Sequence, residues 1–164
     1  MTTEAVRDLL LEIIETRNLI AVFQPIVDVS VGKVLGFEGL IRGPEFSPLH
    51  MPMRLFKAAN QYQLLEPLEK VCVECIFSAF NTQNLPGKLF INVSSHSLIA
   101  SFRLSDYWIG ELINRAIEPE RLVIEISEQY PLEEIQAIMH ATQRYQAAGC
   151  EIAIDDLGAD TRNI

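Results

Sequence analysis

The sequence predicts an α/β fold in which an antiparallel hairpin precedes alternating helices and parallel strands. Residues 20–29 and 33–42 read as strands, and the connection between them is too short for a crossover, so they form a hairpin. From residue 53 onward, helical and extended patterns alternate, which indicates a parallel sheet with right-handed crossovers. The hydrophobic content of 49% suits strands that helices cover on both faces.

The first half of the chain has recognisable signals for each element. An amphipathic helix is predicted over residues 3–17, because apolar residues recur there at helical spacing. These are Val6, Leu9, Leu10, Ile13 and Ile14. Pro25 places the first strand of the hairpin near an edge or a bulge. Two further helices are predicted at 53–61 and 66–81, and Pro67 suits the first turn of the second.

The second half repeats a strand and helix alternation. Strands are predicted at 88–94, 121–128 and 150–156. Ser105 can cap the first intervening helix, whose apolar residues are Trp108, Ile109, Leu112 and Ile113. The second helix ends at Gly149 and carries a stripe of Ile135, Ile138, Met139, Thr142 and Tyr145.

Length and charge limit the classes of function. At 164 residues the chain is sized for one domain. A net charge of -9 argues against binding to long nucleic acid, because such binding needs basic side chains. No uncharged apolar run is long enough for a signal peptide or a membrane span, and the odd count of three cysteines suits a reducing compartment. The sequence therefore predicts a cytoplasmic protein.

Cysteine and histidine do not suggest a soft-metal or nucleophilic site. Cys72 and Cys75 have the spacing of a zinc knuckle, but they fall in the apolar stripe of a predicted helix, and no second pair completes four ligands. His50, His96 and His140 show no ligand spacing with one another. We therefore assign no role to these five residues.

Oxygen side chains recur on apolar strands. Glu38 and Arg42 lie four residues apart, so in a strand they point to the same face, where they can hold a metal ion and a phosphate together. Glu125 lies within an apolar strand, where an unpaired buried carboxylate would cost several kcal/mol; the alternative is an edge strand on which it faces water. Asn92 and Asp155 occupy equivalent strand ends. Such oxygen ligands suit Mg²⁺ or Mn²⁺.

These motifs together resemble the EAL domain family, bacterial phosphodiesterases that hydrolyse cyclic di-GMP. Glu38-Gly39-Leu40 stands where the family usually has Glu-Ala-Leu. Further motifs follow in order: Phe23-Gln24-Pro25-Ile26, Arg42-Gly43-Pro44, Ser47-Pro48-Leu49-His50, Asn92-Val93-Ser94, Glu125-x-x-Glu128 and Asp155-Asp156-Leu157-Gly158. The resemblance implies a modified (β/α)8 TIM-type barrel with one antiparallel strand, of which this chain supplies the first five strands.

The resemblance also implies roles for single residues. A first catalytic Mg²⁺ or Mn²⁺ would be held by Glu38, Asn92, Glu125 and Asp155. Asp156 would hold a second ion, and Glu128 would anchor the loop after the fifth strand and so help to place Asp156. Arg42 would contact a phosphate oxygen of cyclic di-GMP, while Gln24 and Leu40 would line the guanine and ribose side. The implied reaction is hydrolysis to linear pGpG by a two-metal mechanism.

The final residues depart from the family pattern. After Gly158 the family continues with three more strands that carry a lysine, a glutamate and a glutamine, whereas here the chain runs through 159–164. We therefore expect residues 1–164 to be the N-terminal part of a single EAL domain, with its barrel portion at 20–158, and to be inactive alone. The alternatives are a non-catalytic module that binds cyclic di-GMP or a partner protein, and a metal-binding structural domain.

Two further expectations concern assembly. Five strands cannot close a barrel, so the open edge and its apolar surface predict a homodimer or other self-association. The family also leads us to expect sensor or GGDEF-type domains in a longer parent protein.

Overall fold

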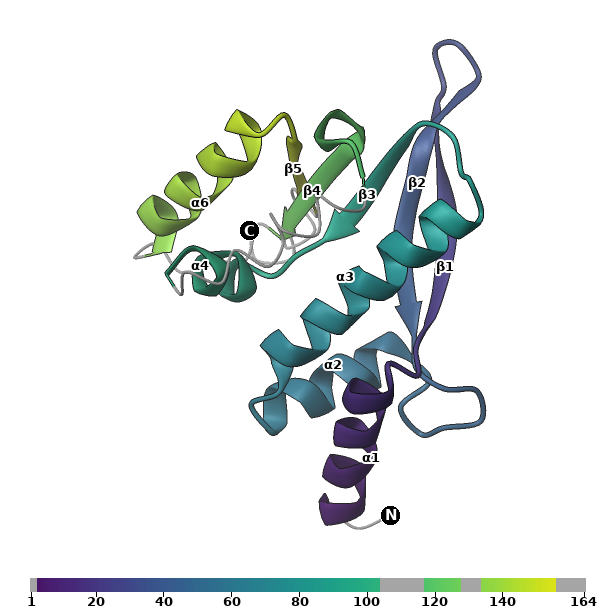
Figure 1. Cartoon of the computed structure of the whole chain (residues 1–164), viewed down its shortest axis with the longest axis vertical. Coiled ribbons are helices and arrows are strands. Elements are labelled where there is room, and N and C mark those ends of the chain that lie inside the picture. The colour runs from purple at the N-terminus through teal and green to yellow at the C-terminus, as the bar shows by residue number, and fades with distance from the viewer. Residues whose placement is uncertain (1–2, 104–116, 128–133, 156–164) are drawn as a thin grey trace, which may run out of the picture. The chain divides into compact units, whose positions relative to one another are not determined.

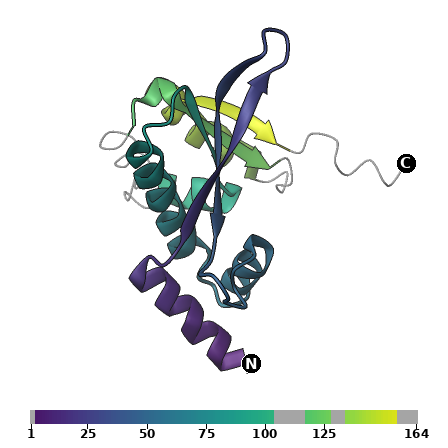
Figure 2. The same cartoon turned by 90° about the vertical axis from the view of Figure 1, so that its right-hand side faces the viewer.

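The computed structural model describes residues 3–103, 117–127 and 134–155. The chain divides into two compact units, Met1–Pro86 and Gly87–Ile164. Their helices and strands are drawn in Figures 1 and 2. The helix predicted around Trp108 lies outside the described residues. No helix within the described ranges combines the length and the apolar character that a membrane crossing requires.

The first unit contains the five elements that the sequence predicts there. They are α1 (Thr3–Thr16), β1 (Ile20–Asp28), β2 (Lys33–Arg42), α2 (Pro52–Gln61) and α3 (Leu65–Thr82). Pro67 falls in the first turn of α3, as expected, because proline lacks the N–H that a helix interior needs.

The strands β1 and β2 form the predicted antiparallel hairpin. Their register runs from Ile20 opposite Arg42 to Asp28 opposite Lys33, with a shift between Ile26 and Val27. This irregularity follows Pro25 directly, which confirms the prediction of an edge or a bulge.

Helix α3 packs along one face of this hairpin (Figure 1). The rings of Phe23 on β1 and Phe80 on α3 lie 5.9 Å apart between centroids. Helices α1 and α2 also contact α3. Leu10, Leu55 and Leu68 are fully buried there, so the core of this unit lies around α3.

The second unit is built on three parallel strands. Its elements are β3 (Lys88–Asn92), α4 (Ser95–Arg103), the short 3-10 helix η1 (Pro119–Arg121), β4 (Leu122–Ser127), α6 (Ile135–Ala147) and β5 (Glu151–Asp155). Strand β4 pairs in parallel with both β3 and β5. Its residues Leu122 and Ile124 are fully buried. The α/β class and the parallel pairing are confirmed.

Helix α4 was not predicted, because the sequence was interpreted as a turn at Asn92-Val93-Ser94 followed by a helix from Ser105. The structure shows that Ser94 caps α4: its hydroxyl accepts a hydrogen bond from the N–H of Ser97 at 3.1 Å. Leu98 and Ile99 are buried, so the helix has an apolar face. A serine followed by apolar residues at positions 98 and 99 is the signal that could have identified it.

The apolar stripe that was predicted for the helix before Gly149, now α6, is partly wrong. Met139 is 53% exposed, whereas Ile138, Ala141 and Tyr145 are buried. The buried face therefore follows the 138–141–145 spacing, and Met139 lies one position away from it. Gly149 has a φ of +105°, which confirms that it ends the helix segment through a backbone conformation that side chains disfavour.

Candidate metal and phosphate site

The first group of predicted site residues lies on one face of the hairpin. Glu38, Leu40 and Arg42 alternate along β2, and Gln24 on β1 is the register partner of Glu38. Side chains of opposite residues in an antiparallel pair point to the same face. Helix α3 packs on the other face, where Phe23 and Gly39 are register partners. The expectation that Glu38 and Arg42 share a face is therefore confirmed.

Burial differs among these four side chains. Glu38, Leu40 and Arg42 are half-buried, whereas Gln24 is exposed. The Nη1 atom of Arg42 donates a hydrogen bond to the carbonyl oxygen of Ile41 at 2.8 Å. This bond uses one donor of the guanidinium fork, which has five N–H groups in all. The remaining donors are chemically suited to a phosphate.

The loop that follows Arg42 is closed at its base. The N–H of Gly43 donates to the carbonyl oxygen of His50 at 2.9 Å, and Nδ1 of His50 lies 2.9 Å from the carbonyl oxygen of Gly43. A Cβ atom on Gly43 would overlap the carbonyl oxygen of Leu49. Only glycine fits this contact. No role was predicted for His50, although its motif, Ser47-Pro48-Leu49-His50, is separated from Arg42-Gly43-Pro44 by only two residues.

The second group comes from the parallel strands. Asn92 on β3 is the register partner of Glu125 on β4. The N–H of Val93 donates to the carbonyl oxygen of Glu125 at 3.0 Å, which extends the ladder beyond the end of β3. Asp155 takes the register position opposite Ser127, two residues beyond Glu125. Because strand faces alternate with a period of two, these positions belong to one face of the sheet.

Glu125 lies on an interior strand of this unit, since β4 has a partner on each side. Its side chain is half-buried, and its Oε2 atom is shielded from solvent. The alternative of an edge strand with Glu125 facing water is therefore wrong. Asn92, by contrast, is exposed. A carboxylate oxygen shielded from water, at the register position opposite an asparagine, is a donor set that fits a hard divalent cation.

The full ligand set stays a prediction. Glu128 and Asp156 lie outside the described residues, and Glu38 and Arg42 belong to a different unit from Asn92, Glu125 and Asp155. Within the described ranges, no group of three or more histidine, cysteine, aspartate or glutamate side chains is arranged to hold a metal ion.

The cysteines occupy apolar surroundings. Burial, with a smaller contribution from the negative charge of Glu69, raises the pKa of the Cys72 thiol far above its ordinary value. Burial also raises the pKa of Cys75, whose Sγ donates to the carbonyl oxygen of Leu19 at 3.6 Å. Burial and the nearby Glu120 raise the pKa of Cys150 to about 11. All three thiols are therefore held in the protonated form at neutral pH.

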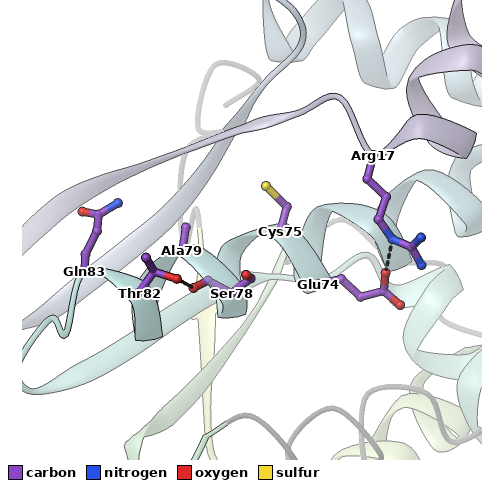
Figure 3. Close-up of a pocket in the computed structure, with 7 residues that line it drawn as sticks. All are labelled: Arg17, Glu74, Cys75, Ser78, Ala79, Thr82 and Gln83. Carbon is purple, nitrogen blue, oxygen red and sulfur yellow. Dashed lines mark hydrogen bonds and ion pairs between the residues drawn. The ribbon is translucent and has the colours of Figure 1, made fainter.

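A separate pocket of about 530 Å³ lies along α3 in the first unit (Figure 3). Its lining comes from Arg17 and from one side of α3: Glu74, Cys75, Ser78, Ala79, Thr82 and Gln83. Nε of Arg17 and Oε2 of Glu74 form an ion pair of 3.0 Å at one end. None of the predicted site residues lines this pocket, so it is distinct from the hairpin face that carries Glu38 and Arg42.

Comparison with known proteins identifies the family. The EAL domain family matches residues 5–164. A probable cyclic di-GMP phosphodiesterase of Escherichia coli, PdeB, is 27% identical over 150 residues, covering 88% of this chain and 28% of the relative. The chain thus spans less than a third of that protein's length.

Solved structures show the same fold. The PaMucR phosphodiesterase in complex with c-di-GMP matches with a TM-score of 0.75 at 22% identity, over 94% of this chain and 64% of that chain. A Klebsiella pneumoniae BlrP1 structure, a manganese and cy-diGMP complex, matches with a TM-score of 0.70 at 23% identity, over 87% of this chain and 35% of that chain. The α/β class is thus that of EAL barrels, and this chain belongs to the EAL domain family.

Proposed function

We propose that this chain forms the first part of a cyclic di-GMP phosphodiesterase site, which in an intact domain hydrolyses cyclic di-GMP to linear pGpG. The observation that carries the proposal is the register pairing of Asn92 with Glu125 on an interior strand, where one oxygen of Glu125 is shielded from solvent. The family match and the phosphodiesterase relative give this pair of donors its chemical context.

The proposed roles follow the face on which each residue lies. One divalent ion, Mg²⁺ or Mn²⁺, would be held by Glu38, Asn92, Glu125 and Asp155. Asp156 would hold a second ion, and Glu128 would anchor the segment that carries Asp156. Such ions, when bound, would lower the pKa of the attacking water and place positive charge beside the phosphate.

The hairpin would bind and orient the nucleotide. Arg42 would donate to a phosphate oxygen, and the closed loop from Gly43 to His50 would fix the backbone directly after it. Gln24 and Leu40 share the face of Glu38 and would line the guanine and ribose side. Orientation of the phosphate relative to the attacking water is a major part of the rate in such reactions.

Binding and turnover are separable in this proposal. Glu38, Arg42, Asn92, Glu125 and Asp155 act on the ground state through metal and phosphate, whereas activation of water needs further groups of the family. For residues 1–164 alone we expect weak, Mn²⁺-dependent binding of cyclic di-GMP without detectable hydrolysis. Binding without turnover in the full-length parent as well would favour the alternative, a non-catalytic module.

Calorimetric titration beside chromatography of the reaction mixture tests this. Arg42→Ala should weaken Mn²⁺-dependent binding by roughly 1.5 to 3 kcal/mol, the scale of a hydrogen bond to a charged group. Arg54→Ala removes an exposed arginine from α2 in the same unit and should leave binding unchanged. Robust hydrolysis by residues 1–164 would show that the catalytic groups are misassigned, and equal losses in both variants would refute the role of Arg42.

The proposal includes self-association. Five apolar side chains near the hairpin tip are exposed: Val27, Val29, Val31, Val34 and Leu35. An exposed apolar surface of this kind favours association with a second copy. Light scattering after size exclusion should show a dimer or larger species, and a monodisperse monomer would refute this part. Sensor or GGDEF-type domains in a longer parent are proposed as the source of the input signal.

A further inference from the structure

The hairpin holds Glu38 between two different environments. On one face lie Glu38 and Arg42, and on the other lie Phe23 and Gly39, which are register partners. Helix α3 packs on this second face. Gly39, the residue that follows Glu38 in the chain, therefore lies on the face of β2 that packs against the helix.

Gly39 on β2 lies in close contact with Ile76 on α3. A Cβ atom on Gly39 would overlap Cγ2 of Ile76 and would lie 3.3 Å from its Cδ1. Ile76 is only 5% exposed, and a β-branched side chain in a helix has one strongly preferred rotamer, so it cannot readily turn away. The side chain of Ile76 thus occupies the space that an alanine at position 39 would need.

The contact also accounts for a departure in the sequence. Glu38-Gly39-Leu40 has glycine where the EAL motif usually has alanine. In this chain alanine would push β2 away from α3 or force Ile76 to move, because buried side chains are close-packed. Either shift would move Glu38, and metal–oxygen distances tolerate changes of only about 0.2 Å.

We propose that Gly39 and Ile76 form a positioning pair, in which their contact sets the height of β2 above α3 and so places Glu38 for the divalent cation. This inference rests on the proposed function, because it assumes that Glu38 is a metal ligand. Neither Gly39 nor Ile76 touches the ion or the nucleotide in this account. Their effect passes through the backbone of β2.

A double-mutant cycle in the metal-free protein tests the contact itself. Gly39→Ala should lower the unfolding midpoint by about 5 °C, the effect of one overpacked methyl group in a domain of this size. Ile76→Ala removes Cγ2 and should also lower the midpoint, by about 10 °C. The double variant should unfold close to Ile76→Ala alone, because the new methyl group then has room. If the losses in midpoint of the two single variants add up in the double variant, the proposed contact between positions 39 and 76 is wrong.

A Mn²⁺ titration of the same variants tests positioning. Gly39→Ala should weaken Mn²⁺ affinity about tenfold, as expected when support of a ligand is lost. Gly39→Ala with Ile76→Ala should bind Mn²⁺ more tightly than Gly39→Ala alone, although it is less stable. Gly39→Ala with Ile76→Val keeps Cγ2 and should not recover affinity. If the double variant Gly39→Ala with Ile76→Ala does not fold, Gly39→Ala with Ile76→Leu takes its place, because leucine lacks Cγ2 but has the same volume as isoleucine.

Controls separate this inference from the proposed function. Leu55→Ala in α2 destabilises the same unit through a fully buried side chain, and its Mn²⁺ affinity should equal that of the wild type. Unchanged affinity in Gly39→Ala despite a lowered midpoint would overturn the positioning role. Failure of the wild type to bind Mn²⁺ would refute both the proposed function and the positioning role. The double-mutant cycle in the metal-free protein would still show whether Gly39 and Ile76 are in contact.

Discussion

The two units of this chain place their predicted site residues in different ways. In the first unit, Glu38, Leu40 and Arg42 follow one another along a single strand, so period-two alternation alone puts them on one face. In the second unit, Asn92 and Glu125 come from different strands and meet only because β3 and β4 pair in parallel with this register. One arrangement is local, and the other depends on tertiary pairing.

Because of this difference, different elements support the predicted site residues in the two units. The hairpin face is supported from behind by α3, through Gly39 and Ile76 in particular. In the second unit, the face that carries Asn92 and Glu125 is supported by β4, which has a paired strand on each side. Changes to α3 should therefore disturb Glu38, and changes to the core of β4 should disturb Glu125.

The largest expected effect is on β4. Ile124→Ala should lower the free energy of unfolding by about 3 to 4 kcal/mol, because this fully buried side chain leaves a cavity. Ile154→Ala on β5 is the matched control, since Ile154 is 49% exposed and should cost less than about 1 kcal/mol. Denaturant unfolding measures both, and equal losses would contradict an interior β4.

The next effect concerns the loop after Arg42. Gly43→Ala should cost about 2 to 3 kcal/mol, because its methyl group would displace the backbone of Leu49. Gly32→Ala has open space but a φ of +64°, so it should cost only about 1 kcal/mol of backbone strain. Thermal unfolding compares the two. A cheaper change at Gly43 than at Gly32 would show that the loop base is not tight.

A smaller effect depends on pH. Burial raises the pKa of Cys150 in the folded state from 9.0 to about 11, so the folded state favours the neutral thiol. The resulting stability is fully present below pH 9 and is lost as pH rises toward 11, by about 1 kcal/mol at pH 10. Unfolding at pH 8 and pH 10 should show a smaller alkaline loss in Cys150→Ala. The same loss in both proteins would contradict this environment.

The smallest effects belong to two ion pairs, one in each unit. Arg17 pairs with Glu74 at 3.0 Å, and Lys88 pairs with Glu151 at 2.5 Å. Arg17 and Glu151 are largely exposed, at 64% and 58%, so either pair should contribute only about 0.5 kcal/mol, and less in high salt. Arg17→Met and Lys88→Met, unfolded at low and high salt, measure this. Losses above about 2 kcal/mol would indicate a larger structural role.

Much of the fold follows from the sequence because its signals are local. Proline at position 67, glycine at position 149 and the short connection between β1 and β2 each act through backbone geometry, which a sequence displays directly. Helix α4 was missed because its cap, Ser94, was interpreted as part of a turn. Serine favours both environments through the same hydrogen bond to the backbone.

The site was predictable to a different extent in each unit. Alternation predicted the shared face of Glu38 and Arg42 from spacing alone. The register between Asn92 and Glu125 could not be derived in this way, because a shift by one residue would turn either side chain to the other face. The closeness of Gly39 to Ile76 was also invisible, since it depends on how a helix packs on a strand 37 positions earlier in the chain.

The central claim is that Glu125 forms part of a site for a divalent cation. It is tested most directly by the thermal midpoint of the wild type and Glu125→Gln, with and without saturating Mn²⁺. An ion at a hundred times its dissociation constant adds about 2.7 kcal/mol to stability, a rise of about 5 to 10 °C for this chain length. Glu118→Gln, which changes an exposed glutamate of the same unit, is the control. We predict that the rise is kept in the wild type and in Glu118→Gln and is mostly lost in Glu125→Gln; an equal rise in all three proteins would contradict the claim.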